Sequence, residues 1–220
     1  MQHRIDELRA DAARLAGQVL QQVGDAVEAY RTGNIELARR VSQSDREIDN
    51  AELEIERAAI DLLSLFRPAA GEFRLVITII KINNDLERIA DCASNIAERV
   101  RTLRADHDAA HTTYGVPKEL AELGLIVTDL VRQTIQTFNY TDPQRARVVI
   151  AQDNRIDALY ASVVQAQMTD MRADGEHVNR DMAHIMIAKN LERIGDHCTN
   201  IAEDIVYATS GEIIRHRSAV

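Results

Sequence analysis

The sequence predicts an all-α protein of six long helices, arranged as two repeated three-helix bundles. Glycine and proline together make up 12 of the 220 residues, and aromatic residues only 4%. Such scarcity of turn-forming and aromatic residues disfavours β-sandwiches and barrels. Apolar residues recur at spacings of three and four along nearly the whole chain, which is typical of amphipathic helices. A segment near residue 90 is repeated near residue 195, so the plan of the chain is duplicated.

The first half of the chain divides into three helical segments. An apolar stripe runs from Ile5 to Val23, and the break at 32–34 contains Gly33. A second helix is expected from about Ile35 to Phe66, because Pro68 follows it. The third helix carries apolar residues at helical spacing. Its stripe comprises Ile79, Ile82, Leu86, Ile89, Ala93, Ile96 and Val100.

The second half repeats this plan. A fourth helix is expected from about Lys118 to Phe138, and Pro143 suits the first position of a fifth. That fifth helix carries Val149, Ile156, Leu159, Val163 and Met168 inward. A turn at Asp174-Gly175 precedes a sixth helix from about Asn179 to Ala208. The predicted division is a first repeat at 1–105, a linker at 106–116, a second repeat at 117–210 and a tail at 211–220.

Composition excludes several classes of function. The formal net charge of −9 argues against non-specific nucleic-acid binding, which depends on clustered Lys and Arg. Apolar runs such as 75–80 are far shorter than the roughly 20 residues that span a membrane. The charged start does not resemble a signal peptide. The two cysteines, Cys92 and Cys198, are expected to be buried small apolar residues, and these features together favour the cytoplasm.

The internal repeat preserves polar residues as well as apolar ones. Residues 86–98 align with 191–203, and nine of these thirteen positions are identical. Packing alone would preserve the apolar positions and leave the surface free to change. A weaker match joins 45–49 to 153–157. The shared polar residues include two carboxylate pairs at spacing i, i+4 in each copy, which are Asp45 with Asp49, Glu87 with Asp91, Asp153 with Asp157, and Glu192 with Asp196.

Folding each copy into a helical hairpin brings its two carboxylate pairs to the same level. The midpoint between the pairs falls at Pro68 in the first copy and between Asp174 and Gly175 in the second, where turns are expected. Four such carboxylates repel one another unless a cation neutralises them. Oxygen ligands suit Mg, Mn, Ca or iron. The sequence therefore predicts two carboxylate metal sites.

The helical wheel places these sites on the outside of the bundle. Glu87 and Asp91 lie nearly opposite the apolar stripe of their helix, at about 100° per residue. An acidic face opposite a core is also what an ordinary solvated helix surface looks like. Both interpretations stay open at this point, although the duplication favours a functional one.

Other motifs carry less weight. In the pair His197-Cys198, a solvated histidine and a buried cysteine are expected, because adjacent helical residues diverge. Asp181 and His184 are expected to be solvated. Arg88 and Arg193 are expected to form weak surface ion pairs with neighbouring glutamates. The sequence has no P-loop, dinucleotide-binding glycine motif or nucleophile elbow, so an enzyme is not predicted.

These residues resemble the PhoU family of phosphate-transport regulatory proteins. The similarity lies in Glu-Arg-Ile-Ala-Asp at 87–91, Glu-Arg-Ile-Gly-Asp-His at 192–197, and the segment 200–207 followed by Gly211, Glu212 and His216. It covers essentially the whole chain. The resemblance implies two three-helix repeats that bind metal on their surface as multinuclear clusters, with iron, Mn, Mg or Zn as the cofactor. The implied ligands are Asp45, Asp49, Glu87, Asp91, Asp153, Asp157, Glu192 and Asp196.

The resemblance also implies a cytoplasmic, non-enzymatic regulator that is often a homodimer. Its implied partners are the ATPase of the high-affinity phosphate importer and a sensor histidine kinase, and its implied effect is to damp the phosphate-starvation response. The two copies differ from each other at these sites in two ways. The first has Ala90 and Cys92 where the second has the more usual Gly195 and His197, and the second has Lys189 where the first has Asn84. The two sites are therefore not expected to bind metal equally. A helical scaffold without functional metal, and less favourably a carboxylate-bridged metalloenzyme, remain as alternatives.

Overall fold

A computed structural model describes residues 1–110, 115–173, 175–212 and 214, with the side chains of 106–110 left out. Every regular element of the described residues is helical, as the sequence predicts. The elements are α1 (Gln2–Thr32), α2 (Ile35–Phe66), α3 (Ala70–Ala110), α4 (Lys118–Tyr140), α5 (Pro143–Ile150), α6 (Asp153–Ala173), the short 3-10 helix η1 (Gly175–His177) and α7 (Val178–Ser210). None of these described helices is both long and apolar enough to cross a membrane.

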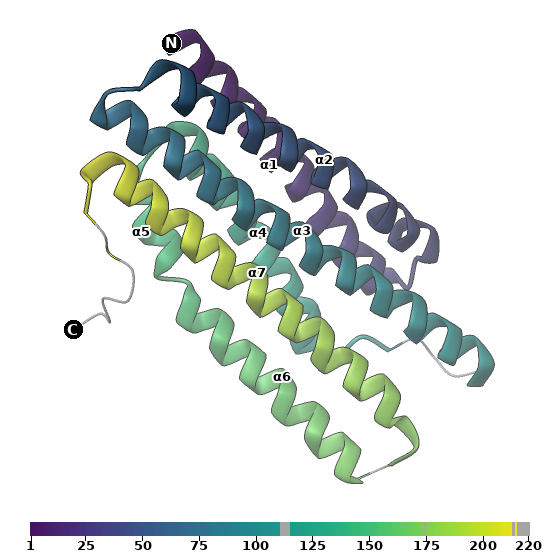
Figure 1. The fold of residues 1–220 in the computed structure, drawn as a ribbon. Coiled ribbons are helices and arrows are strands. Elements are labelled where there is room, and N and C mark those ends of the chain that lie inside the picture. The colour runs from purple at the N-terminus through teal and green to yellow at the C-terminus, as the bar shows by residue number, and fades with distance from the viewer. Residues whose placement is uncertain (111–114, 174, 213, 215–220) are drawn as a thin grey trace.

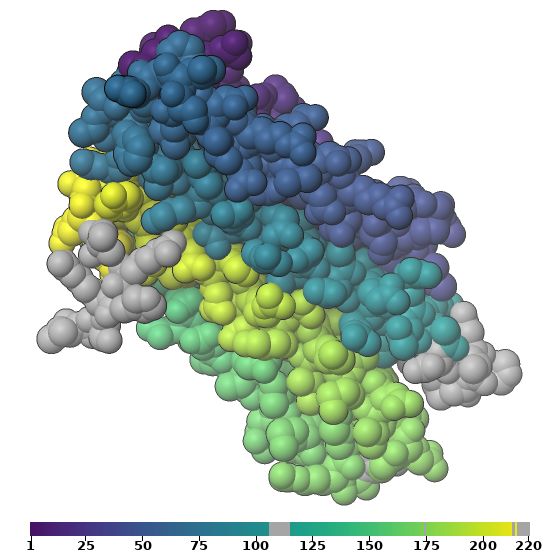
Figure 2. Space-filling view, viewed as in Figure 1, coloured from purple at the N-terminus to yellow at the C-terminus, as the bar shows by residue number. Residues whose placement is uncertain are grey.

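The helices form two three-helix units that pack side by side. Helices α1, α2 and α3 contact one another, and α4, α6 and α7 do the same, with α5 against α4 and α7. The units meet where α3 packs along α7 and α1 along α4. In Figure 1, α2, α3, α7 and α6 lie side by side in one layer, and α1, α4 and α5 lie behind it. In the space-filling view of Figure 2, the side chains of these four helices cover the outer face of the layer without a gap between neighbouring helices.

The apolar stripes predicted from the sequence form the core. Ile5 and Val23 of α1 and Ile82 and Val100 of α3 are at most 1% exposed. Both cysteines are buried, as expected. One inward assignment is wrong, because Met168 near the end of α6 is 39% exposed.

The predicted fifth helix is broken in two. Helix α5 ends at Ile150, a turn at Ala151 and Gln152 follows, and α6 starts at Asp153. In this turn the Gln152 amide donates to the Val149 carbonyl at 3.0 Å, which tightens the backbone out of the α-helical pattern. The Gln152 side chain also donates to Gln133 of α4 at 2.9 Å. Helix α2, its counterpart in the first unit, runs without such a break.

The other boundaries follow local chemistry. Gly33 ends α1 and Gly211 ends α7, with φ values of 65° and 73° that favour glycine. Helix α3 continues to Ala110, so the helix covers the start of the predicted linker. Residues 111–114 of that linker lie outside the described residues, as do Asp174 of the predicted turn and 213 and 215–220 of the predicted tail.

Candidate metal centres

The two acidic sites lie where α2 faces α3 and where α6 faces α7. Asp45 and Asp49 come from α2, and Glu87 and Asp91 from the facing part of α3. Their counterparts lie on α6 (Asp153 and Asp157) and α7 (Glu192 and Asp196). We call these the first and second acidic sites.

The second acidic site brings three carboxylates together. Oxygen atoms of Asp157, Glu192 and Asp196 all lie within 4.8 Å of one another. The fourth predicted residue, Asp153, lies outside that trio but raises the pKa of Asp196 by its negative charge. Carboxylate oxygens at this separation match the donor set of a hard or borderline divalent cation.

The first acidic site is more open. Among the described residues, its carboxylates do not form a trio as close as that of the second site. They still act on one another, because the charges of Asp45 and Asp91 raise the pKa of Asp49, and the charge of Asp91 raises that of Glu87. The hairpin register predicted from the sequence is therefore consistent with the electrostatics of this site.

Partial burial makes the ionised form of these carboxylates less favourable. Loss of hydration is the largest cause of the raised pKa of Asp49, Glu87, Asp153 and Asp196. The pKa of Asp196 rises to about 6, with the charge of Glu192 as the second cause. A bound cation would reverse this effect because it favours the ionised carboxylates. The donor set and the mutual repulsion thus both fit a cation.

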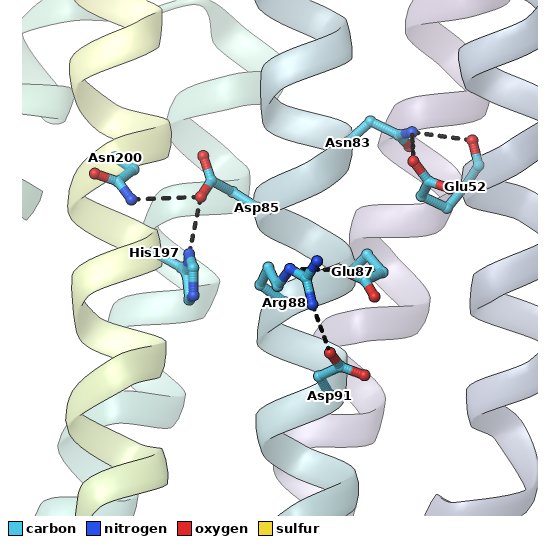
Figure 3. Close-up of polar contacts among 8 residues, drawn as sticks. All are labelled: Glu52, Asn83, Asp85, Glu87, Arg88, Asp91, His197 and Asn200. Atoms are coloured by element: carbon cyan, nitrogen blue, oxygen red, sulfur yellow. Dashed lines mark hydrogen bonds and ion pairs between the residues drawn. The ribbon is translucent and has the colours of Figure 1, made fainter.

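Each site already contains a basic side chain that offsets part of the charge. Figure 3 shows Arg88 between Glu87 and Asp91. Arg88 lies 3.2 Å from each of them, so the predicted ion pair with Glu87 is confirmed. Lys189 lies 2.6 Å from Glu192. The pair expected for Arg193 is absent among the described residues, where Lys189 pairs with Glu192 instead.

Sequence reasoning missed the hydroxyl groups that hold one aspartate in each site. Ser94 Oγ donates to Asp45 at 2.7 Å, and Thr199 Oγ1 donates to Asp153 at 3.2 Å. Gln22 of α1 also donates to Asp45, at 3.3 Å. Ser94 and Thr199 occupy the same position of the repeat, three residues after Asp91 and Asp196, and that shared hydroxyl was the available signal.

The expectation that Asp181 and His184 are solvated is wrong. They are 1% and 3% exposed. Arg180 pairs with Asp181 at 2.9 Å, and His184 Nδ1 lies 2.9 Å from Oε1 of buried Gln167. These residues lie at the start of α7, away from the acidic sites, and are part of the core of the second unit.

The histidine of the pair His197-Cys198 is not solvated either. His197 Nδ1 lies 2.8 Å from Asp85 of α3, and both side chains are largely buried. Asn200 donates to the same Asp85 oxygen at 3.4 Å (Figure 3). This polar group joins α3 of the first unit to α7 of the second, the same two helices that carry Glu87, Asp91, Glu192 and Asp196.

Comparison with known proteins identifies the family. The family model of the PhoU domain matches residues 12–100 and again 120–205. The chain belongs to the PhoU family. A curated relative, the phosphate-specific transport system accessory protein PhoU homolog of Zymomonas mobilis, is 36% identical over 96% of this chain and 87% of its own length. The corresponding PhoU homolog of Caulobacter vibrioides is 34% identical over 93% of this chain and 87% of its own.

Solved PhoU structures share the fold. The crystal structure of PhoU from Pseudomonas aeruginosa matches with a TM-score of 0.90 and 31% identity, covering 96% of this chain and 99% of that one. The phosphate transport system regulatory protein PhoU from Streptococcus pneumoniae matches with a TM-score of 0.88 and 24% identity, covering 97% and 98%. The PhoU fold of two three-helix units predicted from the resemblance is therefore confirmed.

Proposed function

We propose that this chain is a non-enzymatic, cytoplasmic regulator of phosphate uptake. In this proposal it restrains the high-affinity phosphate importer and the phosphate-starvation response, through the importer's ATPase subunit and a sensor histidine kinase, and acts as a homodimer. Membership of a family whose curated relatives are accessory proteins of phosphate transport supports the regulatory role. The proposed metal, iron, Mn, Mg or Zn, is held by the carboxylates of the two acidic sites.

The observation that carries the metal part is the close trio of the second site. Three carboxylates at most 4.8 Å apart repel one another, and burial together with the charge of Glu192 raises the pKa of Asp196. Such an arrangement lowers stability unless a cation uses it. The same i, i+4 carboxylate pairs recur on α2 and α3, which indicates that the acidic residues serve more than solubility.

A regulatory test compares cells that carry the wild-type protein with cells that carry a quadruple variant. The variant combines Glu87→Gln, Asp91→Asn, Glu192→Gln and Asp196→Asn. With phosphate plentiful, we expect a phosphate-starvation reporter to stay repressed with the wild type and to be derepressed with the variant. A control of equal charge change replaces four exposed carboxylates away from the sites, Glu36, Glu54, Asp129 and Asp170, by amides. Normal repression in cells that lack the protein altogether would refute the regulatory role.

A biochemical test addresses the partners and the metal together. The wild type, purified gently from phosphate-replete cells, is expected to retain the importer ATPase and the kinase and to contain stoichiometric metal by elemental analysis. The quadruple variant is expected to lose the metal and to bind these partners less. Light scattering of the wild type is expected to give the mass of a dimer.

A scaffold without functional metal is the second candidate. The observation in its favour is that Arg88 and Lys189 already neutralise part of each site. If the quadruple variant keeps full partner binding and repression, and the wild type contains no metal, the scaffold is the correct description.

A further inference from the structure

The two acidic sites differ at one end, where the first is richer in oxygen donors. Glu52 of α2 lies one turn beyond Asp49, and the same position in α6 is Tyr160. Asn83, which donates to the Glu52 carboxylate, lies one turn before Glu87 on α3, so this contact is at the end of the first site. Glu52 therefore extends the first site by one turn of α2, although the paired i, i+4 pattern does not include it.

A buried asparagine holds Glu52 in place. Asn83 of α3 is 0% exposed, and its Nδ2 donates to the Glu52 backbone carbonyl at 3.0 Å and to Glu52 Oε1 at 3.1 Å. Figure 3 shows the Asn83 side chain pointing from α3 toward Glu52. The oxygen of the same amide, Oδ1, is buried and has no hydrogen-bond partner among the described residues. An unpaired buried amide oxygen beside carboxylates is the kind of donor that a hard cation accepts.

The second site has a cation of its own at this end. The counterpart of Asn83 is Ala188, and the counterpart of Asn84 is Lys189. Lys189 lies 2.6 Å from Glu192 and 5.4 Å from the centre of the Tyr160 ring. Where the first unit has a carboxylate and a neutral amide, the second therefore has an aromatic ring and an ammonium group. The first unit is more negative here by two charges.

We propose that the first acidic site extends along α2 to Glu52, which serves as an additional ligand positioned by Asn83, and that this site consequently binds divalent cations more tightly than the second. This inference rests on the proposed function, because it assumes that the acidic sites bind metal. Lys189 competes with an incoming cation for Glu192 in the second site, and Arg88 does so for Glu87 and Asp91 in the first, but only the first site gains a further carboxylate from Glu52. The two sites would then fill in order as the metal concentration rises.

The test uses Mn²⁺ and full-length proteins in which one site is disabled. Asp157→Asn with Asp196→Asn leaves the first site, and Asp49→Asn with Asp91→Asn leaves the second. Mn²⁺ affinity is measured by calorimetry and by electron paramagnetic resonance of free Mn²⁺. In the first-site protein, Glu52→Gln is expected to weaken Mn²⁺ binding about tenfold, because the number of charged ligands sets affinity. The matched control is Glu54→Gln, which removes the same charge from an exposed position of α2.

A converse variant adds affinity instead of removing it. In the second-site protein, Tyr160→Glu with Lys189→Asn installs the counterparts of Glu52 and Asn84 and is expected to tighten Mn²⁺ binding about tenfold. If Glu52→Gln binds like the Glu54→Gln control, or if the first-site protein binds no tighter than the second, the extension to Glu52 is wrong while metal binding stands. If neither single-site protein nor the wild type binds Mn²⁺, this inference and the metal part of the proposed function both fail.

Discussion

At the scale of single residues, the second unit contains a buried polar group that the first lacks. Asp181 and His184 occupy the positions at which the first unit has Val76 and Ile79, all four of them buried. His184 lies 2.9 Å from Gln167. Polarity alone suggested a solvated face, but aligning the two repeats assigns both positions to the core. The internal repeat is thus a better guide to burial here than residue type.

His184 is expected to make the protein less stable in mild acid. Burial, followed by the nearby charge of Arg180, lowers its pKa from 6.5 to about 4. The unfolded chain then takes up a proton before the folded one does, so stability falls as the pH drops from about 6.5 to 4, by about 3 kcal/mol for this shift. Urea unfolding across this range should show that loss in the wild type and a smaller loss in His184→Leu. Equal pH profiles for the two proteins would contradict the assignment.

Asp196 is expected to have the opposite pH dependence. Its folded pKa of about 6 exceeds the ordinary value of 3.8, so the folded protein holds the proton longer than the unfolded chain. In metal-free protein its contribution therefore makes stability fall as the pH rises from about 4 to 6. The melting temperature of Asp196→Asn, measured in chelator, should decline less over this range than that of the wild type. Saturating Mn²⁺ at neutral pH should raise the melting temperature of the wild type by more than that of this variant, in which only the first site is intact.

At the scale of helices, each acidic site depends on a hydroxyl that crosses from one helix to the other. Ser94 on α3 holds Asp45 on α2, and Thr199 on α7 holds Asp153 on α6. Removing a group that orients a metal ligand typically lowers the affinity for the metal by about 10-fold to 100-fold. The helix pair therefore contributes both the carboxylates and the groups that fix their direction.

Thr199→Val tests this orienting role. Valine has nearly the shape of threonine but cannot donate to Asp153, so the affinity of the second site for Mn²⁺ is expected to fall about tenfold. Thr199→Ser keeps the hydroxyl and should bind nearly as well as the wild type. Full affinity in Thr199→Val, at unchanged helicity, would show that Asp153 needs no partner from α7.

Local sequence patterns predicted most of the helices, and they predicted that the acidic pairs of facing helices lie at the same height. They could do so because helical periodicity and turn residues can be recognised within short stretches of sequence. They did not predict the break at Ala151 and Gln152, which contains neither glycine nor proline and is held in part by Gln133 of another helix. Glu52 and Gln22 were not predicted to belong to the first site, for a similar reason. Their partners Asn83 and Ser94 lie on other helices, so only the packed structure shows that they belong to the first site.

At the scale of the whole molecule, the two units are joined through α3 and α7. This contact contains polar pairs as well as apolar residues. Asp85 accepts from His197 and Asn200, and Lys81 lies 3.2 Å from Asp204, which is 2% exposed. Which helices meet across the two units could not be predicted from periodicity, because α3 and α7 each show one continuous helical pattern whatever their partner. Because these polar pairs tie α3 to α7, we expect the two units to unfold together.

Asp85→Ala is expected to destabilise both units together. The change removes the acceptor shared by His197 and Asn200 and should lower the free energy of unfolding by about 2 kcal/mol, because its lost hydrogen bonds are charge-assisted and mostly shielded from water. If α3 and α7 couple the units, urea unfolding stays a single transition and amide exchange rises in α1 and α6 alike. The control Asp129→Ala removes an exposed ion pair with Arg132 and should cost less than about 1 kcal/mol. Faster exchange confined to α4–α7, or two separate transitions, would show instead that the units fold independently and that their contact only aligns them.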